Sequence, residues 1–203
     1  MANKYGLSRD IPSGIKRAVR QACGYGCVIC GAAIIDYEHV DPEYHEAREH
    51  NPNAIALLCP THHAQCTRGF LSKDSVKQAM LSPVCKKHGY ASEFFDIGRS
   101  HPKLVFAGMT FINTRIPVEV KGVPLIKTEQ DEELGGPFRL SGNFYNSQGQ
   151  PSLEILENEW RVISSNWDVE VAGGVITIRD TTGHISLAHL LASPHVTTRC
   201  SSG

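Results

Sequence analysis

The sequence predicts an α+β protein, with a helical, zinc-stabilised N-terminal part over residues 1–90 and a mostly β C-terminal part over residues 91–203. Three observations predict this fold class: apolar residues at helical spacing near the N-terminus, two pairs of closely spaced metal-binding residues, and short β-type runs beyond residue 90. The length of 203 residues fits one domain or two small ones, because a domain commonly has about 100 to 200 residues.

Three segments of the N-terminal part carry signals for helices. Apolar residues recur at helical spacing over residues 15–22 with basic residues between them, which predicts an amphipathic helix that begins near Pro12. A second helix is predicted over residues 60–67, since it starts with a proline, which fits the first turn of a helix, and is soon followed by glycine. Ser72 is placed to start a third helix over residues 73–80.

The remaining segments predict strands, loops and a linker. Residues 34–39 form a short β-branched run that predicts a strand, and the polar residues 41–53 predict a loop. The acidic run 129–136 predicts an internal linker. Trp160 and Trp167 are expected in the core of a sheet rather than as platforms that stack on bases. Further short strands are predicted at 103–106, 111–115, 118–121, 153–156, 169–171, 175–179 and 184–187.

Composition and charge exclude several classes of protein. Apolar residues make up 41% of the chain and charged residues 20%, which disordered and fibrous proteins do not show. Neither a membrane-spanning run nor a secretory signal is visible, so we expect a soluble, cytoplasmic protein with no membrane partner. The net charge of -1 divides into 11 Lys and Arg against 8 Asp and Glu in residues 1–90, and 9 against 13 in residues 91–203. Different partners for the two parts follow from this division.

Four residues that can bind a metal are spaced in two pairs. Cys27 and Cys30 form a C-x-x-C pair, and Cys59 and His62 form a C-x-x-H pair 29 residues further on. Two such pairs can share one tetrahedral ion, and three cysteines with one histidine are a common ligand set for structural zinc. A redox-active C-x-x-C pair is the alternative, and Cys23 and Cys66 are competing ligands outside the two pairs.

A histidine, an asparagine and a second histidine lie beside these metal-binding pairs in a fixed order. His39 ends the predicted strand, Asn53 precedes the second pair, and His63 directly follows the zinc ligand His62. With these residues the chain resembles the HNH endonuclease family, whose ββα-metal unit places such side chains around one divalent ion. The resemblance covers about residues 20–70. It is carried by Cys27-Val-Ile-Cys30, Tyr37-Glu-His-Val40, Asn53 and Leu57-Leu-Cys-Pro-Thr-His-His63.

The resemblance implies a role for each residue of the motif. His39 would be the general base, because a histidine with an ordinary pKa of about 6.5 can accept a proton near neutrality. Glu38 and His63 would hold a catalytic Mg²⁺ or Mn²⁺ and leave positions for water and a phosphate oxygen. Asn53 would orient its loop and, through a carbonyl, the His39 ring, with Asn51 as the alternative.

Two positions depart from the common pattern of the family. Glu38 stands where many members have aspartate, and the longer carboxylate can change the preference for the metal. His62 stands as the fourth zinc ligand, where cysteine is frequent. Neither departure removes a group that the reaction needs.

The resemblance implies a metal-dependent endonuclease that hydrolyses DNA, with a role in bacterial defence or restriction. Lys16, Arg17 and Arg20, otherwise an ordinary solvated helix face, would contact phosphates. His45 and His50 in the polar loop are expected to be solvent-exposed, and contact of either with DNA is the alternative. The β-rich part would form a homo-oligomer, bind a regulator or recognise a target. The rival interpretation is a non-catalytic zinc module that binds nucleic acid or protein, and a hydrolase of another phosphoester is the third.

Overall fold

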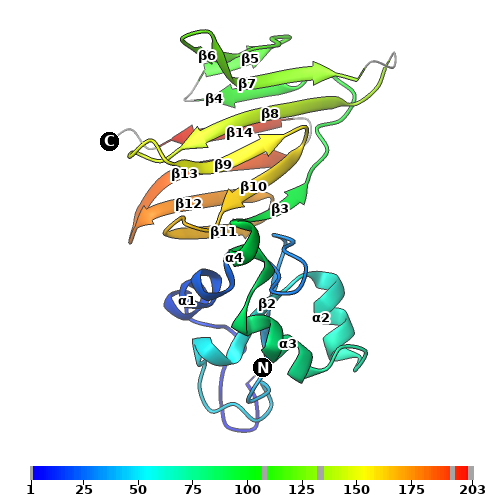
Figure 1. The fold of residues 1–203 in the computed structure, drawn as a ribbon, viewed down its shortest axis with the longest axis vertical. Helices are drawn as coiled ribbons and strands as arrows, with labels where there is room; N and C mark the ends of the chain where they lie inside the picture. The colour runs from blue at the N-terminus through cyan, green and yellow to red at the C-terminus, as the bar shows by residue number, and fades with distance from the viewer. Residues whose placement is uncertain (1, 107–108, 132–134, 193–194, 201–203) are drawn as a thin grey trace. The chain divides into compact units, whose positions relative to one another are not determined.

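The chain has a mixed α and β structure, seen here in a computed structural model that describes residues 2–106, 109–131, 135–192 and 195–200 (Figure 1). It divides into two compact units, Met1–Ala91 and Ser92–Gly203, which we call the N-terminal and C-terminal units. The N-terminal unit holds helices and a short hairpin, and the C-terminal unit is mostly β. None of the helices in the described residues combines the length and apolar character that a membrane crossing requires.

The N-terminal unit is built around a two-stranded hairpin that leads directly into a helix. Its strands are antiparallel, with Asp36 opposite Leu58 and His39 opposite Ile55, and helix α2 begins two residues after the second strand ends. In chain order the elements are α1 (Ser13–Cys23), β1 (Asp36–His39), the 3-10 helix η1 (Pro52–Ala54), β2 (Ile55–Leu58), α2 (Pro60–Thr67), α3 (Lys73–Leu81) and α4 (Val84–His88).

Local sequence signals set the ends of these helices. Helix α1 begins directly after Pro12, as predicted, and it ends where Gly24 adopts a left-handed conformation with φ of 74°. The predicted helix over residues 60–67 is confirmed as α2. Helix α3 is also confirmed, and the Ser72 hydroxyl accepts a hydrogen bond from the Ser75 N–H at 3.1 Å, which caps the first turn.

The core of the N-terminal unit lies around strand β2. All four of its residues are buried, and Val19 of α1 and Val76 of α3 are fully buried in the same cluster. The N–H of Val28 donates to the carbonyl of Leu57 at 3.0 Å, so the segment that carries the first cysteine pair is hydrogen bonded to β2. The hairpin is therefore the scaffold that both metal-binding pairs share.

Two six-stranded sheets make up the β-rich part of the chain, in the orders β3-β10-β9-β8-β7-β6 and β11-β12-β13-β14-β4-β5 (Figure 1). Strands β14 and β4 pair in parallel, which joins the last strand of the chain to an early one. The strands are β3 (Tyr90–Phe94), β4 (Lys103–Phe106), β5 (Met109–Ile112), β6 (Val118–Val120), β7 (Val123–Gln130), β8 (Phe138–Tyr145), β9 (Pro151–Leu156), β10 (Glu159–Ile163), β11 (Asp168–Ala172), β12 (Val175–Thr181), β13 (His184–Ala192) and β14 (His195–Cys200).

In several of these strands alternate side chains are buried. Strand β8 shows the alternation over its whole length, and Leu153 with Ile155 in β9 and Ile176 with Ile178 in β12 repeat it. Trp160 is only 2% exposed, which confirms the prediction that it belongs to the sheet core, whereas Trp167 is half-buried. Burial of this kind removes a large apolar area from water and stabilises the unit.

Some expectations for this part of the chain are wrong. Glu129 and Gln130 belong to strand β7, so the predicted linker over 129–136 does not begin there, and its residues 132–134 lie outside the described residues. The strand expected at 111–115 is β5 and ends at Ile112. Strands β7, β8 and β10 and helix α4 were not predicted, because polar and charged residues interrupt their apolar patterns.

Candidate functional site

The two metal-binding pairs are shaped by different local structures. In the first pair, the Gly31 N–H donates to the Cys27 carbonyl at 2.9 Å and the Cys27 N–H donates to the Ala32 carbonyl at 2.8 Å, which closes a tight turn. Gly31 has φ of 84°, a left-handed conformation that favours glycine. In the second pair, Cys59 caps helix α2, and one helical turn brings His62 beside it.

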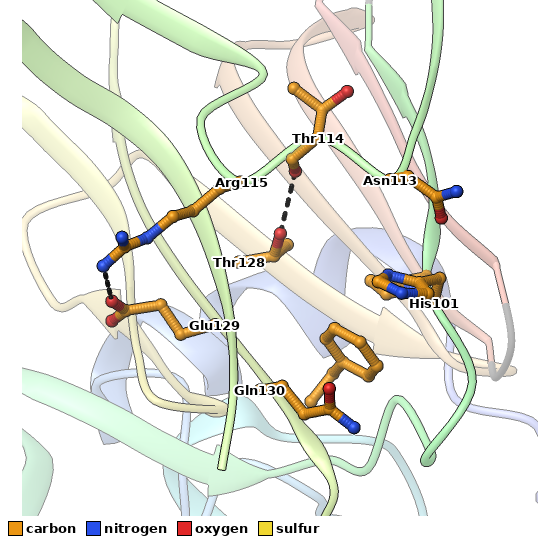
Figure 2. Close-up of a pocket in the computed structure, with 9 residues that line it drawn as sticks. His101, Asn113, Thr114, Arg115, Thr128, Glu129 and Gln130 are labelled. Carbon is orange, nitrogen blue, oxygen red and sulfur yellow. Dashed lines mark hydrogen bonds and ion pairs between the residues drawn. The ribbon is translucent and has the colours of Figure 1, made fainter. Parts of the chain in front are cut away.

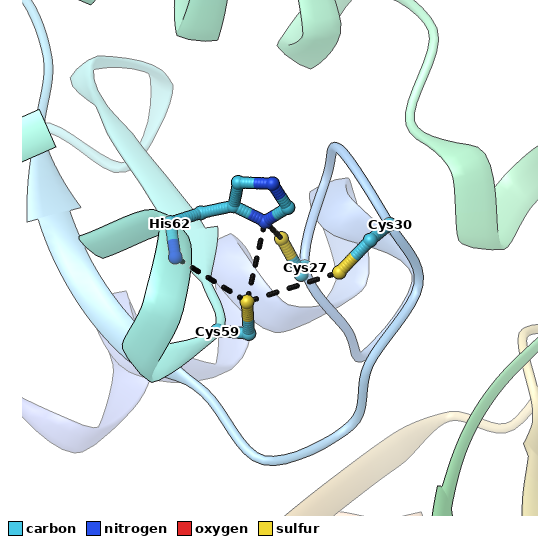
Figure 3. A group of neighbouring side chains, drawn as sticks. All are labelled: Cys27, Cys30, Cys59 and His62. Atoms are coloured by element: carbon cyan, nitrogen blue, oxygen red, sulfur yellow. Dashed lines mark hydrogen bonds between the residues drawn. The ribbon is translucent and has the colours of Figure 1, made fainter. Parts of the chain in front are cut away.

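The four ligand atoms converge on one point, as Figure 3 shows. The Nδ1 atom of His62 lies 3.4 Å from the Cys27 sulfur and 3.2 Å from the Cys59 sulfur, and the sulfurs of Cys30 and Cys59 are 3.8 Å apart. Sulfur and nitrogen ligands of one tetrahedral zinc ion are separated by about 3.5 to 3.8 Å. The Cys3His cluster therefore fits a metal such as zinc.

The competing cysteines are outside this cluster. Cys23 is buried in helix α1 and Cys66 in helix α2, and neither belongs to the group of metal-ligating atoms found in the described residues. The pKa of Cys23 is raised to about 11, chiefly by burial. Both side chains therefore serve as small apolar groups of the core.

Electrostatics within the cluster favour a cation. The pKa of Cys30 is raised to about 12, first by the removal of water from its sulfur and then by the neighbouring Cys27 and Cys59 sulfurs. The Cys30 thiol therefore keeps its proton when no cation is bound. Because zinc binds cysteine as the thiolate, binding of a metal would release this proton, which couples metal binding to pH.

A second group of polar side chains lies where β1 ends and α2 begins. The Nε2 atom of His63 is 3.1 Å from the Oε2 atom of Glu38, whose side chain is only 13% exposed. The ammonium of Lys73, from the first turn of α3, forms an ion pair with the other carboxylate oxygen of Glu38 and donates to the His39 carbonyl at 2.8 Å. Glu38 therefore holds a histidine on one oxygen and a lysine on the other.

His39 is buried beside this group and is hydrogen bonded to a second histidine. Its Nε2 atom lies 3.1 Å from Nδ1 of His50, and its ring meets the ring of Tyr44 edge to face at a centroid distance of 5.4 Å. Burial lowers the pKa of His39 below its ordinary value of 6.5, and the charge that His50 can carry lowers the pKa further. A neutral ring at neutral pH can act as a base.

Two expectations about the loop before β2 need correction. His50 was expected to be solvent-exposed, but it is half-buried and occupies the hydrogen-bonding position on His39 that was assigned to Asn53. Asn53 lies in η1 and is exposed, and no hydrogen bond of the described residues joins it to His39. The Asn51 side chain caps η1 by accepting the Asn53 N–H at 3.0 Å. His45 is exposed, as predicted.

The predicted phosphate-binding face of α1 is smaller than expected. Arg20 is only 6% exposed and its guanidinium donates to the Tyr37 hydroxyl at 3.0 Å, so Arg20 ties α1 to β1 inside the protein. Lys16 and Arg17 stay on the partly exposed face, with Lys16 paired to Asp10 at 3.3 Å. The assignment of Arg20 to phosphate contact is therefore wrong.

Sequence reasoning missed three residues around the site. His50 and Lys73 contact His39 or Glu38 from segments 11 or more residues away, and the guanidinium of Arg9 lies 5.2 Å over the Tyr44 ring. None of the three lies at a distance in the sequence from His39 or Glu38 that is typical of a known motif. Only the path of the loops brings them to the site.

A separate pocket of about 290 Å³ lies in the C-terminal unit (Figure 2). His101 borders it, the Arg115 guanidinium is paired with the Glu129 carboxylate at 2.6 Å, and the Thr128 hydroxyl donates to the Thr114 carbonyl at 2.9 Å. Arg115 is thus paired with Glu129, and Thr128 with Thr114. They give no sign of a particular ligand.

The family of the chain is not given by comparison with known proteins. Searches against protein-family models, curated proteins and solved structures all find no match. The features that bear on function are the Cys3His cluster and the neighbouring group of Glu38, His39 and His63.

Proposed function

We propose that the N-terminal unit is a metal-dependent endonuclease of the HNH type that hydrolyses DNA phosphodiester bonds. One observation carries the proposal: Glu38 and His63, which are 25 positions apart in the chain, approach to 3.1 Å directly beside the buried His39. A carboxylate, an imidazole and a neutral histidine base in one place are what metal-assisted hydrolysis requires. The Cys3His cluster on the same hairpin and helix would hold them in position.

The donor pair of Glu38 and His63 fits a divalent cation. Two adjacent ligands of an octahedral ion at about 2.1 Å are about 3.0 Å apart, close to the observed separation of 3.1 Å. Carboxylate oxygen and imidazole nitrogen together suit Mn²⁺, and a carboxylate with several waters suits Mg²⁺. The ion would stabilise the negative charge that develops on the leaving 3′ oxygen. Lys73 would give up its ion pair with Glu38 when the ion binds.

His39 would accept the proton of the attacking water. Its buried ring stays neutral at neutral pH because burial lowers its pKa. Arg9 lies over Tyr44, and Tyr44 packs against His39, so a positive charge is available next to the base for a substrate phosphate. Lys16 and Arg17 on α1 would provide further contacts to the DNA backbone.

Cleavage of supercoiled plasmid tests this function directly. We expect nicked or linear plasmid only when Mg²⁺ or Mn²⁺ is added, and we expect His39→Ala to lower the rate by about 10²-fold or more. His45→Ala is the matched control, because His45 is an exposed histidine in the loop that follows strand β1. Zinc content and the circular dichroism spectrum of each variant show whether its fold is intact.

Two results would contradict the nuclease proposal. One is wild-type protein that carries zinc and is folded but cleaves no plasmid with either cation. The other is a His39→Ala variant that cleaves as fast as the wild type. Loss of zinc in His39→Ala would instead show that His39 supports the fold.

A non-catalytic zinc module that binds nucleic acid is the second candidate function. The observation that favours it is the ion pair of Lys73 with Glu38, which satisfies the carboxylate without any cation. In that case the protein would shift a DNA duplex in a gel without cutting it. Glu38→Gln separates the two functions, since it would abolish cleavage by a nuclease but leave DNA binding by a simple module unchanged.

A further inference from the structure

A chain of three hydrogen-bonding groups runs from the N-terminal segment to His39. The Nε2 atom of His50 lies 3.0 Å from the Ser8 carbonyl oxygen, and Nδ1 of His50 lies 3.1 Å from Nε2 of His39. A carbonyl oxygen only accepts hydrogen bonds, so Nε2 of His50 must carry a proton. In a neutral His50, Nδ1 is then an acceptor, and the proton between the two rings belongs to Nε2 of His39.

We propose that His50 is a positioning residue that holds neutral His39 in the tautomer protonated on Nε2 and leaves Nδ1 as the nitrogen that accepts the proton from water. The inference rests on the proposed nuclease function for its catalytic meaning. The tautomer itself is a property of the folded protein and does not depend on that function.

The Ser8 carbonyl is held in place by several contacts of the N-terminal segment. The Asn3 side-chain amide donates to the carbonyls of Tyr44 and Ala47 at 2.6 and 2.7 Å, and the Tyr44 hydroxyl donates to the Leu7 carbonyl at 2.8 Å. These hydrogen bonds join the segment that precedes Ser8 to the loop after β1. His50 is fixed at both of its ring nitrogens, which gives His39 a defined orientation.

The arrangement accounts for the proton in the proposed reaction. As the water oxygen forms a bond to phosphorus, one water proton moves to Nδ1 of His39, and the bond from phosphorus to the 3′ oxygen breaks. The 3′ oxygen then takes a proton from solvent, and His39 returns its proton to solvent. The Nε2 proton stays in its hydrogen bond to His50 throughout, which stabilises the imidazolium that forms for a moment.

Nitrogen-15 NMR of the histidine rings tests the tautomer without any substrate. Long-range proton to nitrogen correlations distinguish a protonated from an unprotonated ring nitrogen. We expect the wild-type spectrum at neutral pH to show His39 protonated on Nε2 and unprotonated on Nδ1. Protonation of His39 on Nδ1 in this spectrum would overturn the inference, and no variant is needed to reach that result.

Two substitutions of His50 then test its effect on the proposed reaction. His50→Ala removes the acceptor and should give a mixture of His39 tautomers, with kcat for plasmid cleavage at least about tenfold lower and KM unchanged. His50→Asn places an amide oxygen near the position of Nδ1 and should restore most of kcat, which a general loss of packing would not allow. Unchanged kcat and an unchanged His39 tautomer in His50→Ala would overturn the inference.

The failure of the two proposals can be told apart. If the wild type shows the expected tautomer but cleaves no plasmid, the nuclease proposal fails and the effect of His50 on the His39 tautomer stands. If the wild type cleaves plasmid and His39 is protonated on Nδ1, the nuclease proposal stands and the inference about His50 fails.

Discussion

The two units of the chain are stabilised by different means. In the N-terminal unit the elements are short, the buried groups include His39 and Arg20, and four side chains converge in a cluster that could hold a metal. In the C-terminal unit, strands such as β8 are hydrogen bonded on both edges and bury alternate side chains. The first unit therefore depends on a few specific polar and sulfur contacts, whereas the stability of the second is spread over backbone ladders and apolar burial.

The largest difference between the units should come from removing one metal ligand. Cys30 is exposed, so Cys30→Ala loses little apolar burial, but it removes one of four ligands. Because structural zinc contributes on the order of 10 kcal/mol to the folding of small domains, we expect the N-terminal unit to unfold or to lose several kcal/mol. Hydrogen exchange should rise in α1 and β2 and stay low in β9, and bound zinc should fall below one per chain.

Cys66→Ala is the matched control for this experiment. Cys66 lies on the same helix as His62 but outside the cluster, so the Cys66→Ala variant should bind as much zinc as the wild type. If Cys30→Ala keeps its zinc and its exchange pattern, the Cys3His assignment is wrong.

A substitution in the core of the C-terminal unit should destabilise that unit alone. Trp160 is 2% exposed, and removing a large buried aromatic side chain costs about 3–5 kcal/mol because a cavity remains. We therefore expect Trp160→Ala to raise hydrogen exchange in β9 and β10 while zinc content and exchange in α1 stay unchanged. Trp167→Ala, at a half-buried position, should have a smaller effect. Parallel loss of protection in both units would show that they do not unfold independently.

Much of the N-terminal unit could be predicted because its signals are local. A proline before α1, a serine before α3 and the two spaced metal-binding pairs each act within a few residues of the structure that they specify. Strand β8 could not be predicted in this way. It contains Gly142 and Asn143, which favour turns, but Gly142 lies opposite Ile126 on one side and Ile155 on the other. Pairing with two neighbours overrides the local preference.

The candidate site likewise contains some residues that local sequence signals predict and others that they do not. The distance between Glu38 and His63 follows from the pairing of β1 with β2 and from the start of α2, which sequence motifs can indicate. The partners His50 and Lys73 come from a loop and from the next helix. The loop path depends on contacts such as that of Asn3 with Tyr44, and no spacing rule encodes such contacts.

A smaller effect is expected where Lys73 pairs with Glu38. Lys73→Met removes a positive charge from the proposed cation site, so the affinity for Mn²⁺ should rise by about tenfold. Lys77→Met is the matched control, because Lys77 lies on the same helix and pairs with the exposed Asp41. Calorimetric titration with Mn²⁺ in zinc-loaded protein measures the change. An equal affinity in wild type and Lys73→Met would contradict the proposed competition between lysine and cation.

The smallest expected effect is the dependence of the N-terminal unit on pH. The folded-state pKa of His39 is lowered by burial, by His50 and by Lys73, and only Glu38 opposes this. As the pH falls below 6.5, the unfolded chain binds the proton first, so the free energy of unfolding decreases until the folded-state pKa is passed. His39→Gln should reduce this slope in denaturant unfolding between pH 7 and about 5. Identical slopes would show that His39 is not held neutral by the fold.

The exposure of Cys30 bears on how long a bound ion would stay in the cluster. Cys27 and Cys59 are buried, so an incoming chelator or small thiol can reach the ion only from the side of Cys30 or of the half-buried His62. Loss of the ion to a competing ligand would proceed by an associative route, in which the chelator or thiol coordinates the ion before Cys30 dissociates from it. The lifetime of the ion would then shorten as the concentration of competing thiols rises, even where its affinity is high.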